Sequence, residues 1–340
     1  MINKFLELSN EEKNSLIMNT AEKMNMPEAI IEKDFWVCFM LDYLFTTFKY
    51  KDFICFKGGT SLSKVYHCIE RFSEDIDLSL DWSVLGFNKE EAYILRSNRQ
   101  QDIFNKNINL KTEKYLKEIF LPLMKKDFFM LLKDDYELYI DENNPQTICF
   151  QYPRVYQDMS ILQIIRLEIG VLAEPIPSYI KTVKPYIEEC YSNLFNNSSQ
   201  IIIRTVDINR TFFEKITILH REAYRTNGNY PMRYSRHFYD LYQMIENGIA
   251  DNALKNIEII KMVVEFKNKF YPCNWANYND VLNGNCKLIP NQEALDIFSK
   301  DYEKMKNMFY GNYPTFNEII KTLSLFEIKL NSHIKNNVNV

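Results

Sequence analysis

The fold is decided by the stretch FICFKGGTSLSKVYHCIERFSEDIDLSL, residues 53–80. Its first four residues are apolar and β-prone and lead into a Gly-Gly pair, which predicts a buried strand followed by a turn. Residues 60–70 carry apolar side chains at spacings of three and four, a pattern that predicts a helix with one buried face. Residues 75–80, DIDLSL, alternate between polar and apolar, so we expect a second strand with both aspartates on one face.

The segments on either side extend this core. Ser9 and Glu12 have the spacing of a capping box, and a further helix is expected over residues 27–45. The charged, periodic residues 89–134 predict a helical insertion that covers the sheet. Further strands are expected at residues 147–152, 161–172 and 201–206, the first two as an antiparallel pair.

These elements predict an α+β fold in two domains. A mixed-sheet domain covered by helices is expected over residues 1–206, and a helical C-terminal domain over residues 207–340. The length of 340 residues agrees with two domains, because single hydrophobic cores stop growing at about 250–300 residues.

The composition excludes several classes of protein. At 46% apolar and 25% charged residues the chain is expected to fold, and its net charge of −4 argues against a protein that coats nucleic acid without specificity. No apolar stretch approaches the roughly 20 residues of a membrane span, and the polar opening lacks the core of a signal peptide, so we expect a cytoplasmic protein with no membrane partner. Seven scattered cysteines without a CxxC pair predict reduced thiols and neither a disulfide framework nor a zinc site.

The glycine pair is the first candidate site. Gly58 and Gly59 lie between a strand and a helix, where the backbone can approach a ligand closely and direct amides at phosphate oxygens. Further candidate donors surround the pair: Lys57 before it, the hydroxyls of Thr60 and Ser61 after it, and Lys64 one helical turn later. The Gly-Lys-Ser/Thr ending of a P-loop is absent, and the alternative is a tight turn that binds nothing.

Three carboxylates form a candidate metal site. Asp75 and Asp77 share one strand face, and carboxylate oxygens are the ligands that Mg²⁺ prefers. Glu168 would add a third carboxylate if its strand lies beside residues 75–80. The alternatives are an exposed strand face for the aspartates and an ion pair with Arg166 for Glu168.

A basic segment points to an anionic ligand. Residues 204–236 contain seven basic and three acidic side chains, a local charge of +4 in an acidic chain. Lys215 and Arg221 are expected on one helix, where they would neutralise a triphosphate. Asp240 is an acid on a mostly buried helix, and it either pairs with Arg236 or belongs to the active site.

The sequence resembles a known family in three segments. FKGGTSLSKVYHCIERFSEDIDLSL, residues 56–80, is similar to the signature of the AbiEii/AbiGii toxin family of nucleotidyltransferases, in the DNA polymerase β-like superfamily. IEKDFWVCFMLDYLF, residues 31–45, resembles the family's N-terminal helix. FFEKITILHREA with RYSRHFYDLYQM, within residues 212–244, resembles its second signature block.

The resemblance implies an activity and its partners. It implies a toxin of a toxin–antitoxin or phage-defence system, with a cognate antitoxin, that transfers a nucleoside monophosphate from an NTP to an acceptor hydroxyl, foremost the 3′ end of tRNA. Two Mg²⁺ ions, or Mn²⁺ in their place, would bind Asp75, Asp77 and Glu168. The predicted catalytic residues are Asp75, Asp77, Lys215 and Asp240, with Asp240 orienting Lys215 or a nucleobase. The predicted nucleotide-binding residues are Lys57, Gly58, Gly59, Thr60, Ser61, Lys64, Arg221 and Arg236.

Two alternatives stay open at the level of sequence. The acceptor could be a protein hydroxyl or a small molecule, or the chain could be a nucleotide-binding regulator without catalysis. The presence of both Asp75 and Asp77 favours an enzyme.

Overall fold

The computed structural model describes the chain except residues 1, 74, 133–135, 157–162, 196–199 and 338–340. The chain divides into two compact units, one of residues 1–65 and 72–206, the other of residues 66–71 and 207–340. The division after Val206 lies where the sequence analysis placed its domain boundary, whereas residues 66–71 group with the second unit.

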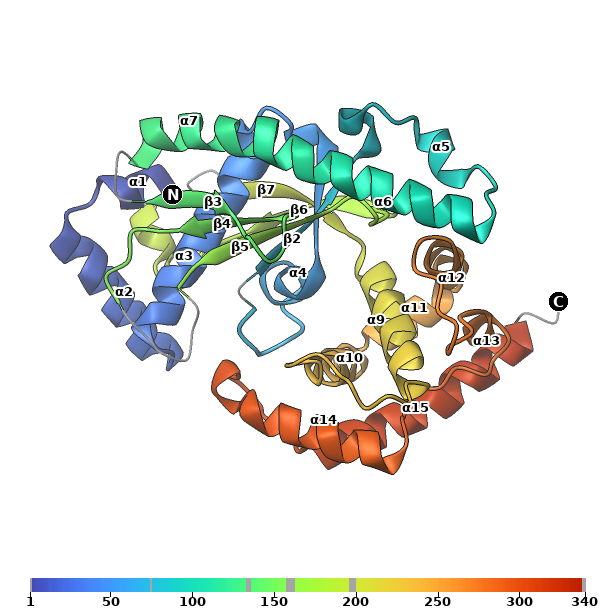
Figure 1. The fold of residues 1–340 in the computed structure, drawn as a ribbon. Helices are drawn as coiled ribbons and strands as arrows, with labels where there is room; N and C mark the ends of the chain where they lie inside the picture. Colours follow the sequence, from blue (N-terminus) through green and yellow to red (C-terminus); the bar gives the residue numbers. More distant parts are fainter. Residues whose placement is uncertain (1, 74, 133–135, 157–162, 196–199, 338–340) are drawn as a thin grey trace. The chain divides into compact units, whose positions relative to one another are not determined.

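The first unit is built on a seven-stranded mixed sheet, so the α+β class is confirmed (Figure 1). The strand order is β3-β4-β5-β2-β1-β7-β6. Neighbouring strands are antiparallel except for the parallel pairs β2–β5 and β1–β7. The strands are β1 (Ile54–Lys57), β2 (Asp75–Leu80), β3 (Glu137–Ile140), β4 (Thr147–Gln151), β5 (Ile165–Gly170), β6 (Ser178–Val183) and β7 (Ile201–Val206).

Five of these strands fall in predicted segments, and the two edge strands do not. The alternation expected for β2 is present, because Ile76, Leu78 and Leu80 are buried while both aspartates are partly exposed. β3 and β6 were missed because most of their side chains are exposed or half-buried, so these edge strands lack the regular apolar alternation of a buried face. Residues 161 and 162 of one predicted strand lie outside the described residues.

Helices surround the sheet, and α3 (Glu28–Asp42) forms the centre of the core. Almost every residue of α3 is buried, and its Trp36 and Phe39 contact Phe150 of β4 with ring centroids 5.9 and 6.3 Å apart. Phe128 of α7 (Leu121–Leu132) joins the same cluster, so α3 and α7 pack on one face of the sheet. The unit's other helices are α1 (Ile2–Glu7), α2 (Asn10–Met24), α4 (Gly58–Lys64), α5 (Lys89–Tyr93), α6 (Asn98–Tyr115), α7 (Leu121–Leu132) and α8 (Tyr186–Cys190).

The helix predicted over residues 60–70 is wrong in its second half. α4 ends at Lys64, and His67 has a positive φ of 49° that an α-helix does not allow. The backbone of residues 66–71 bonds instead to the second unit's own side chains: Tyr239 Oη accepts from the Glu70 amide, and Asn247 donates to the Cys68 carbonyl. These long-range bonds replace the helical ones, and periodicity cannot reveal them.

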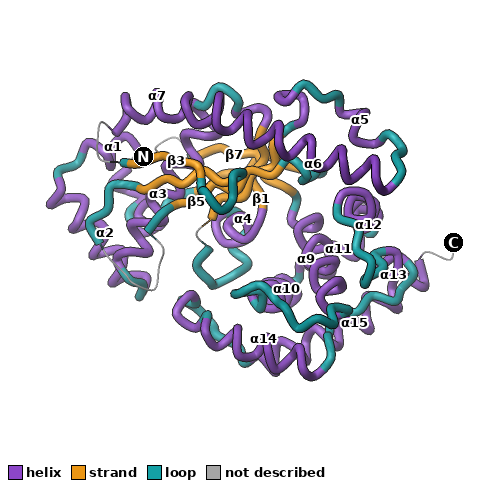
Figure 2. Tube along the Cα trace, viewed as in Figure 1, coloured by secondary structure: helices purple, strands orange, loops and turns teal. Residues whose placement is uncertain are grey.

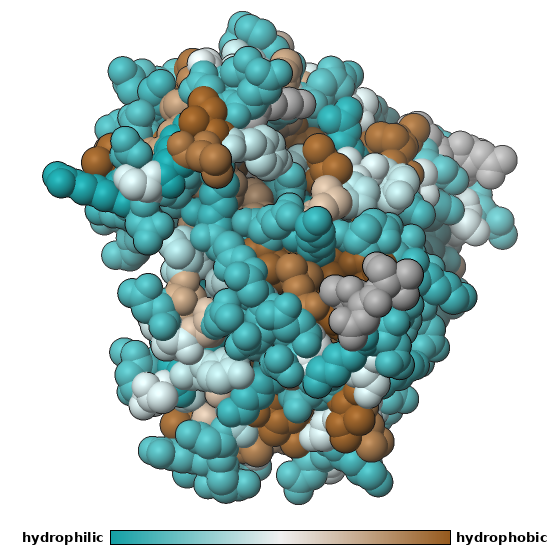
Figure 3. All heavy atoms as spheres, turned by 90° about the vertical axis from the view of Figure 1, so that its right-hand side faces the viewer, coloured by the Kyte–Doolittle hydropathy of each residue, from teal (hydrophilic) through white to brown (hydrophobic). Residues whose placement is uncertain are grey.

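The second unit is almost entirely helix and loop, drawn purple and teal in Figure 2. None of the described helices is both long and apolar enough to span a membrane. The face in Figure 3 is mostly hydrophilic, with its apolar residues in several separate areas. The helices are α9 (Ile208–Ala223), α10 (Arg236–Glu246), α11 (Ile249–Lys255), α12 (Glu258–Phe270), α13 (Asn279–Leu282), α14 (Gln292–Lys304) and α15 (Phe316–Asn337).

Candidate active site

The turn from β1 into α4 holds Gly58 against Asp77. Gly58 has φ +82°, a conformation that side-chain-bearing residues rarely adopt. A Cβ built on it would lie 1.7 Å from Asp77 Oδ2, and Lys57 is the strand neighbour of Asp77 in the β1–β2 pair. Position 58 therefore requires glycine for two reasons: its backbone has a positive φ, and the Asp77 carboxylate occupies the space that a Cβ would need.

The sheet register brings the candidate carboxylates onto one face. β2 and β5 are parallel, with Asp77 beside Glu168 and Asp75 beside Arg166. Paired residues of neighbouring strands project to the same side, so all four side chains share that face. Arg166 Nη1 lies 2.6 Å from Asp141 Oδ2, whereas Arg166 Nε is 3.9 Å from Glu168 Oε1. The main partner of Arg166 is thus Asp141, and its pairing with Glu168, the alternative weighed from sequence, is weak.

These carboxylates fit a divalent metal as a pair. No three His, Cys, Asp or Glu side chains of the described residues gather closely enough to hold an ion among them. Mg²⁺ in phosphate-transferring sites often takes only one or two carboxylates and completes its shell with water and substrate phosphates. Asp75 and Asp77, two residues apart on one face of β2, match that donor set. The role of Glu168 as a metal ligand stays a prediction.

Thr60 and Ser61 hold the turn together. Both residues are buried, at 1% and 0% exposure. The Thr60 hydroxyl bonds to the Asp75 carbonyl and, at 3.0 Å, to the Ser73 hydroxyl, and Ser61 Oγ donates to the Gly58 carbonyl at 2.7 Å. The two hydroxyls therefore fix the backbone around the glycine and the aspartates, and their contacts give no support to the predicted direct role on phosphate.

Lys64 is a buried structural cation. Its Nζ lies 2.6 Å from Asp34 Oδ1 of α3 and 3.8 Å from the centroid of the Tyr186 ring. Burial alone would lower the pKa of Lys64, but Asp34 raises it above its ordinary value. With side chains only 4% and 3% exposed, the pair fastens α4 to α3, so the contacts of Lys64 do not support the predicted nucleotide-binding role.

The second unit contains a buried cluster around Asp240, which is 0% exposed. Arg71 donates to both carboxylate oxygens, at 2.6 and 2.9 Å, and Lys215 Nζ donates to Oδ2 at 2.6 Å. Burial alone would raise the pKa of Asp240, but the two cations hold it below its ordinary value. Burial lowers the pKa of Lys215, with Asp240 acting against it. The structure thus joins Lys215 to Asp240, as the orienting role requires.

The other predicted cations are placed differently. Asp240 binds Arg71 and Lys215, so the alternative of a pair with Arg236 is wrong. Arg236 is half-buried in the first turn of α10 and forms no ion pair with a described residue. Arg221 donates to Glu222 at 2.8 Å and to the Tyr234 hydroxyl at 2.9 Å, and is held within α9 and the following loop.

Arg71 is the residue that sequence reasoning missed. It lies in RFSEDID, four residues before Asp75, and it is 3% exposed. The available signal was a charge directly after the predicted helix of residues 60–70, inside the segment that resembles the family's signature. Its partner Asp240 is 169 residues away in the chain, a distance that no local pattern spans.

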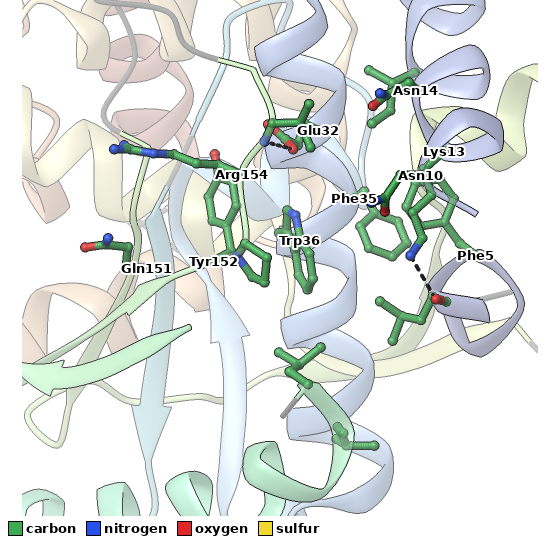
Figure 4. Close-up of a pocket in the computed structure, with 16 residues that line it drawn as sticks. Phe5, Asn10, Lys13, Asn14, Glu32, Phe35, Trp36, Gln151, Tyr152 and Arg154 are labelled. Carbon is green, nitrogen blue, oxygen red and sulfur yellow. Dashed lines mark hydrogen bonds between the residues drawn. The ribbon is translucent and has the colours of Figure 1, made fainter. Parts of the chain in front are cut away.

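A cavity of about 580 Å³ lies elsewhere in the first unit (Figure 4). It lies between α1, α2, α3 and residues 151–155, and Trp36 and Tyr152 stack in its wall with ring centroids 5.8 Å apart. Glu32 of α3 accepts from the backbone amide of Val155 at 2.8 Å, which ties the two sides together. Trp36 packs on the face of the sheet that buries Phe150, opposite to the face of the aspartates, so this cavity is separate from the candidate site.

A family model and a solved structure match this chain. A model of the family described as "Nucleotidyl transferase AbiEii toxin, Type IV TA system" matches residues 41–322. Among solved structures the chain is similar to MenT4, a nucleotidyltransferase toxin from Mycobacterium tuberculosis, with 13% sequence identity, a TM-score of 0.41, and 94% of this chain and 97% of that chain covered. The comparison with curated proteins found no match.

Proposed function

The chain belongs to the AbiEii family of nucleotidyltransferase toxins of type IV toxin–antitoxin systems, and on that premise we propose that it transfers a nucleoside monophosphate from an NTP to an acceptor hydroxyl and releases pyrophosphate. The observation that supports this most strongly is the placement of Asp75 and Asp77 on one face of β2, with the Asp77 carboxylate directly against the backbone of Gly58. Two carboxylates beside a turn without side chains suit a metal-bound triphosphate.

In this proposal Asp75 and Asp77 hold Mg²⁺, or Mn²⁺ in its place. A bound divalent ion would neutralise charge on the triphosphate and lower the pKa of the attacking hydroxyl. Gly58 and Gly59 let the phosphates approach the backbone, and the buried hydroxyls of Thr60 and Ser61 keep that backbone in place. The protein's own contribution at this end of the site is therefore orientation.

Lys215 supplies positive charge for the phosphates. Its Nζ is a hydrogen-bond donor from α9, held in place by Asp240 of α10. A cation that faces the triphosphate stabilises the charge that develops on pyrophosphate as it leaves. Arg236, the predicted cation that no described acid neutralises, is a second candidate for that role.

The proposed acceptor is the 3′ end of tRNA. Several cations in residues 204–236 are in ion pairs with described acids, among them Arg210, Lys215, Arg221 and Arg225. Local charge therefore does not select a polynucleotide by itself, and this part of the proposal rests on the resemblance to a family with members that modify tRNA. NTPs and tRNA are both present in the cytoplasm, so we propose that the protein acts there and that its cognate antitoxin is also cytoplasmic. We further propose a role in phage defence.

The acceptor can be identified by following the label. Wild-type protein is incubated with Mg²⁺, total tRNA and each of the four NTPs, labelled in one series at the α-phosphate and in another at the γ-phosphate. The proposal predicts that α-label becomes attached to tRNA and that γ-label leaves as pyrophosphate. Transfer of γ-label would identify a kinase and contradict it. If α-label is found in protein or small molecules and tRNA is unlabelled, the proposed acceptor is wrong while the proposed transfer of a nucleoside monophosphate is supported.

A further inference from the structure

The Asp240 cluster binds two cations to one carboxylate. Arg71 occupies both oxygens, through Nε on Oδ1 and Nη2 on Oδ2, and Lys215 shares Oδ2. Both cations are buried, with side chains 4% and 7% exposed. Asp240 therefore divides one negative charge between two donors that are shielded from water.

The two cations are not bound equally. The guanidinium of Arg71 makes a bidentate pair, the strongest geometry available to a carboxylate. Lys215 makes a single hydrogen bond to Asp240, its one acceptor among the described residues, although an ammonium group has three donors. Lys215 thus has donor capacity left for another anion.

The energetics of Lys215 agree with this asymmetry. Burial lowers the pKa of Lys215, Asp240 raises it, and Arg71 and Arg236 lower it again. The protonated lysine is therefore less stable here than in water, and an incoming anion would stabilise it.

We propose that Arg71 is a positioning residue: by binding both oxygens of Asp240 it prevents Lys215 from being locked to that carboxylate and leaves the ammonium group able to bind the phosphates of the NTP. This inference rests on the proposed function. Without Arg71, Asp240 and Lys215 would form an exclusive buried pair. Arg71 itself need not touch the substrate, since it acts through Asp240.

A double-mutant cycle on NTP binding tests the inference. The dissociation constant of the α-labelled NTP that wild type binds best is measured by equilibrium dialysis with Mg²⁺ and no acceptor. The variants are Arg71→Met, Asp240→Asn, the double variant and Lys215→Met. Arg71→Met is expected to raise the dissociation constant about tenfold or more, the scale of one charge-assisted hydrogen bond. In the double variant the neutral Asn releases Lys215, so binding is expected to return to within about threefold of Asp240→Asn alone.

A purely structural role for Arg71 gives a different result. In that case the two substitutions add, and the double variant binds NTP no better than Arg71→Met, which would overturn the inference. Wild-type affinity in Arg71→Met would overturn it too. If Arg71→Met does not fold, Arg71→Lys replaces it in the cycle: a lysine cannot bind both oxygens of Asp240 in the bidentate geometry, so the dissociation constant is expected to rise about tenfold. A folded Arg71→Lys protein with wild-type affinity contradicts the proposal.

Failure of the proposed function would look different again. If wild type binds no NTP, or Lys215→Met binds it as wild type does, then the assignment of Lys215 itself is wrong. If Lys215→Met loses affinity while Arg71→Met keeps it, only the role of Arg71 fails.

Discussion

Replacing Gly58 with alanine tests the link between the turn and the aspartates. The new Cβ would lie 1.7 Å from Asp77 Oδ2 and 2.5 Å from its Cγ, whereas ordinary contact begins at 3.4 Å. The carboxylate must therefore move by about 1.7 Å, the difference between these two distances. A misplacement of about 1 Å in a catalytic group can lower a rate about a hundredfold. The positive φ adds about 1–2 kcal/mol of strain.

Gly86→Ala is the matched control for this substitution. Gly86 has φ +78°, close to that of Gly58, and its added Cβ would meet no atom within 4 Å. Both variants are expected to lose about 1–2 kcal/mol in chemical unfolding. In the α-label transfer assay at saturating NTP, only Gly58→Ala is expected to fall about a hundredfold or more. A folded Gly58→Ala protein that transfers label at the wild-type rate would refute the placement of Asp77 in the site.

The remaining predictions concern buried charge in each unit. His220 accepts from the Lys287 amide at Nδ1, which makes Nε2 the donor to the Asn277 carbonyl, and burial lowers the pKa of His220. Below about pH 6.5 the unfolded chain therefore binds a proton that the folded protein does not, so the free energy of unfolding should fall as pH decreases from about 7.5 to 5.5. In denaturant titrations, His220→Gln should reduce that fall by about 1 kcal/mol. An unchanged pH dependence in this variant would contradict the prediction. Lys64→Met leaves Asp34 buried without its cation and should cost about 3–5 kcal/mol of stability, whereas a loss below about 1 kcal/mol would show that the pair is unimportant.

The central unit of the fold follows from local pattern. Alternation in residues 75–80, with the glycine pair before them, fixes β1, the turn and β2, because side-chain period and backbone freedom are properties of the local chain. The parallel neighbour β5 also follows in outline, since its alternating apolar residues require one buried face. These patterns place Asp75, Asp77 and Glu168 on strands, and the register then puts them on one face.

The rest of the site depends on contacts that sequence does not encode locally. Arg71 contacts Asp240 because α4 ends at Lys64 and residues 66–71 pack in the second unit. From sequence, Lys64 is a candidate phosphate ligand, but in the structure it pairs with Asp34, thirty positions earlier in the chain. A charged side chain has the same appearance in a sequence whether it meets substrate or a buried partner, so the roles of lysine and arginine were the least predictable part of the site.

The measurement that tests the account most directly is transfer of α-labelled nucleotide by wild type and Asp77→Asn over a series of Mg²⁺ concentrations. Asparagine keeps the shape of Asp77 and removes its charge, so folding should be preserved while metal binding is weakened. The account predicts that wild type transfers label with Mg²⁺ and not with EDTA, and that Asp77→Asn is slower by about a thousandfold, the scale of several kcal/mol of charge stabilisation. A folded Asp77→Asn protein with the wild-type rate and the wild-type Mg²⁺ dependence would contradict it.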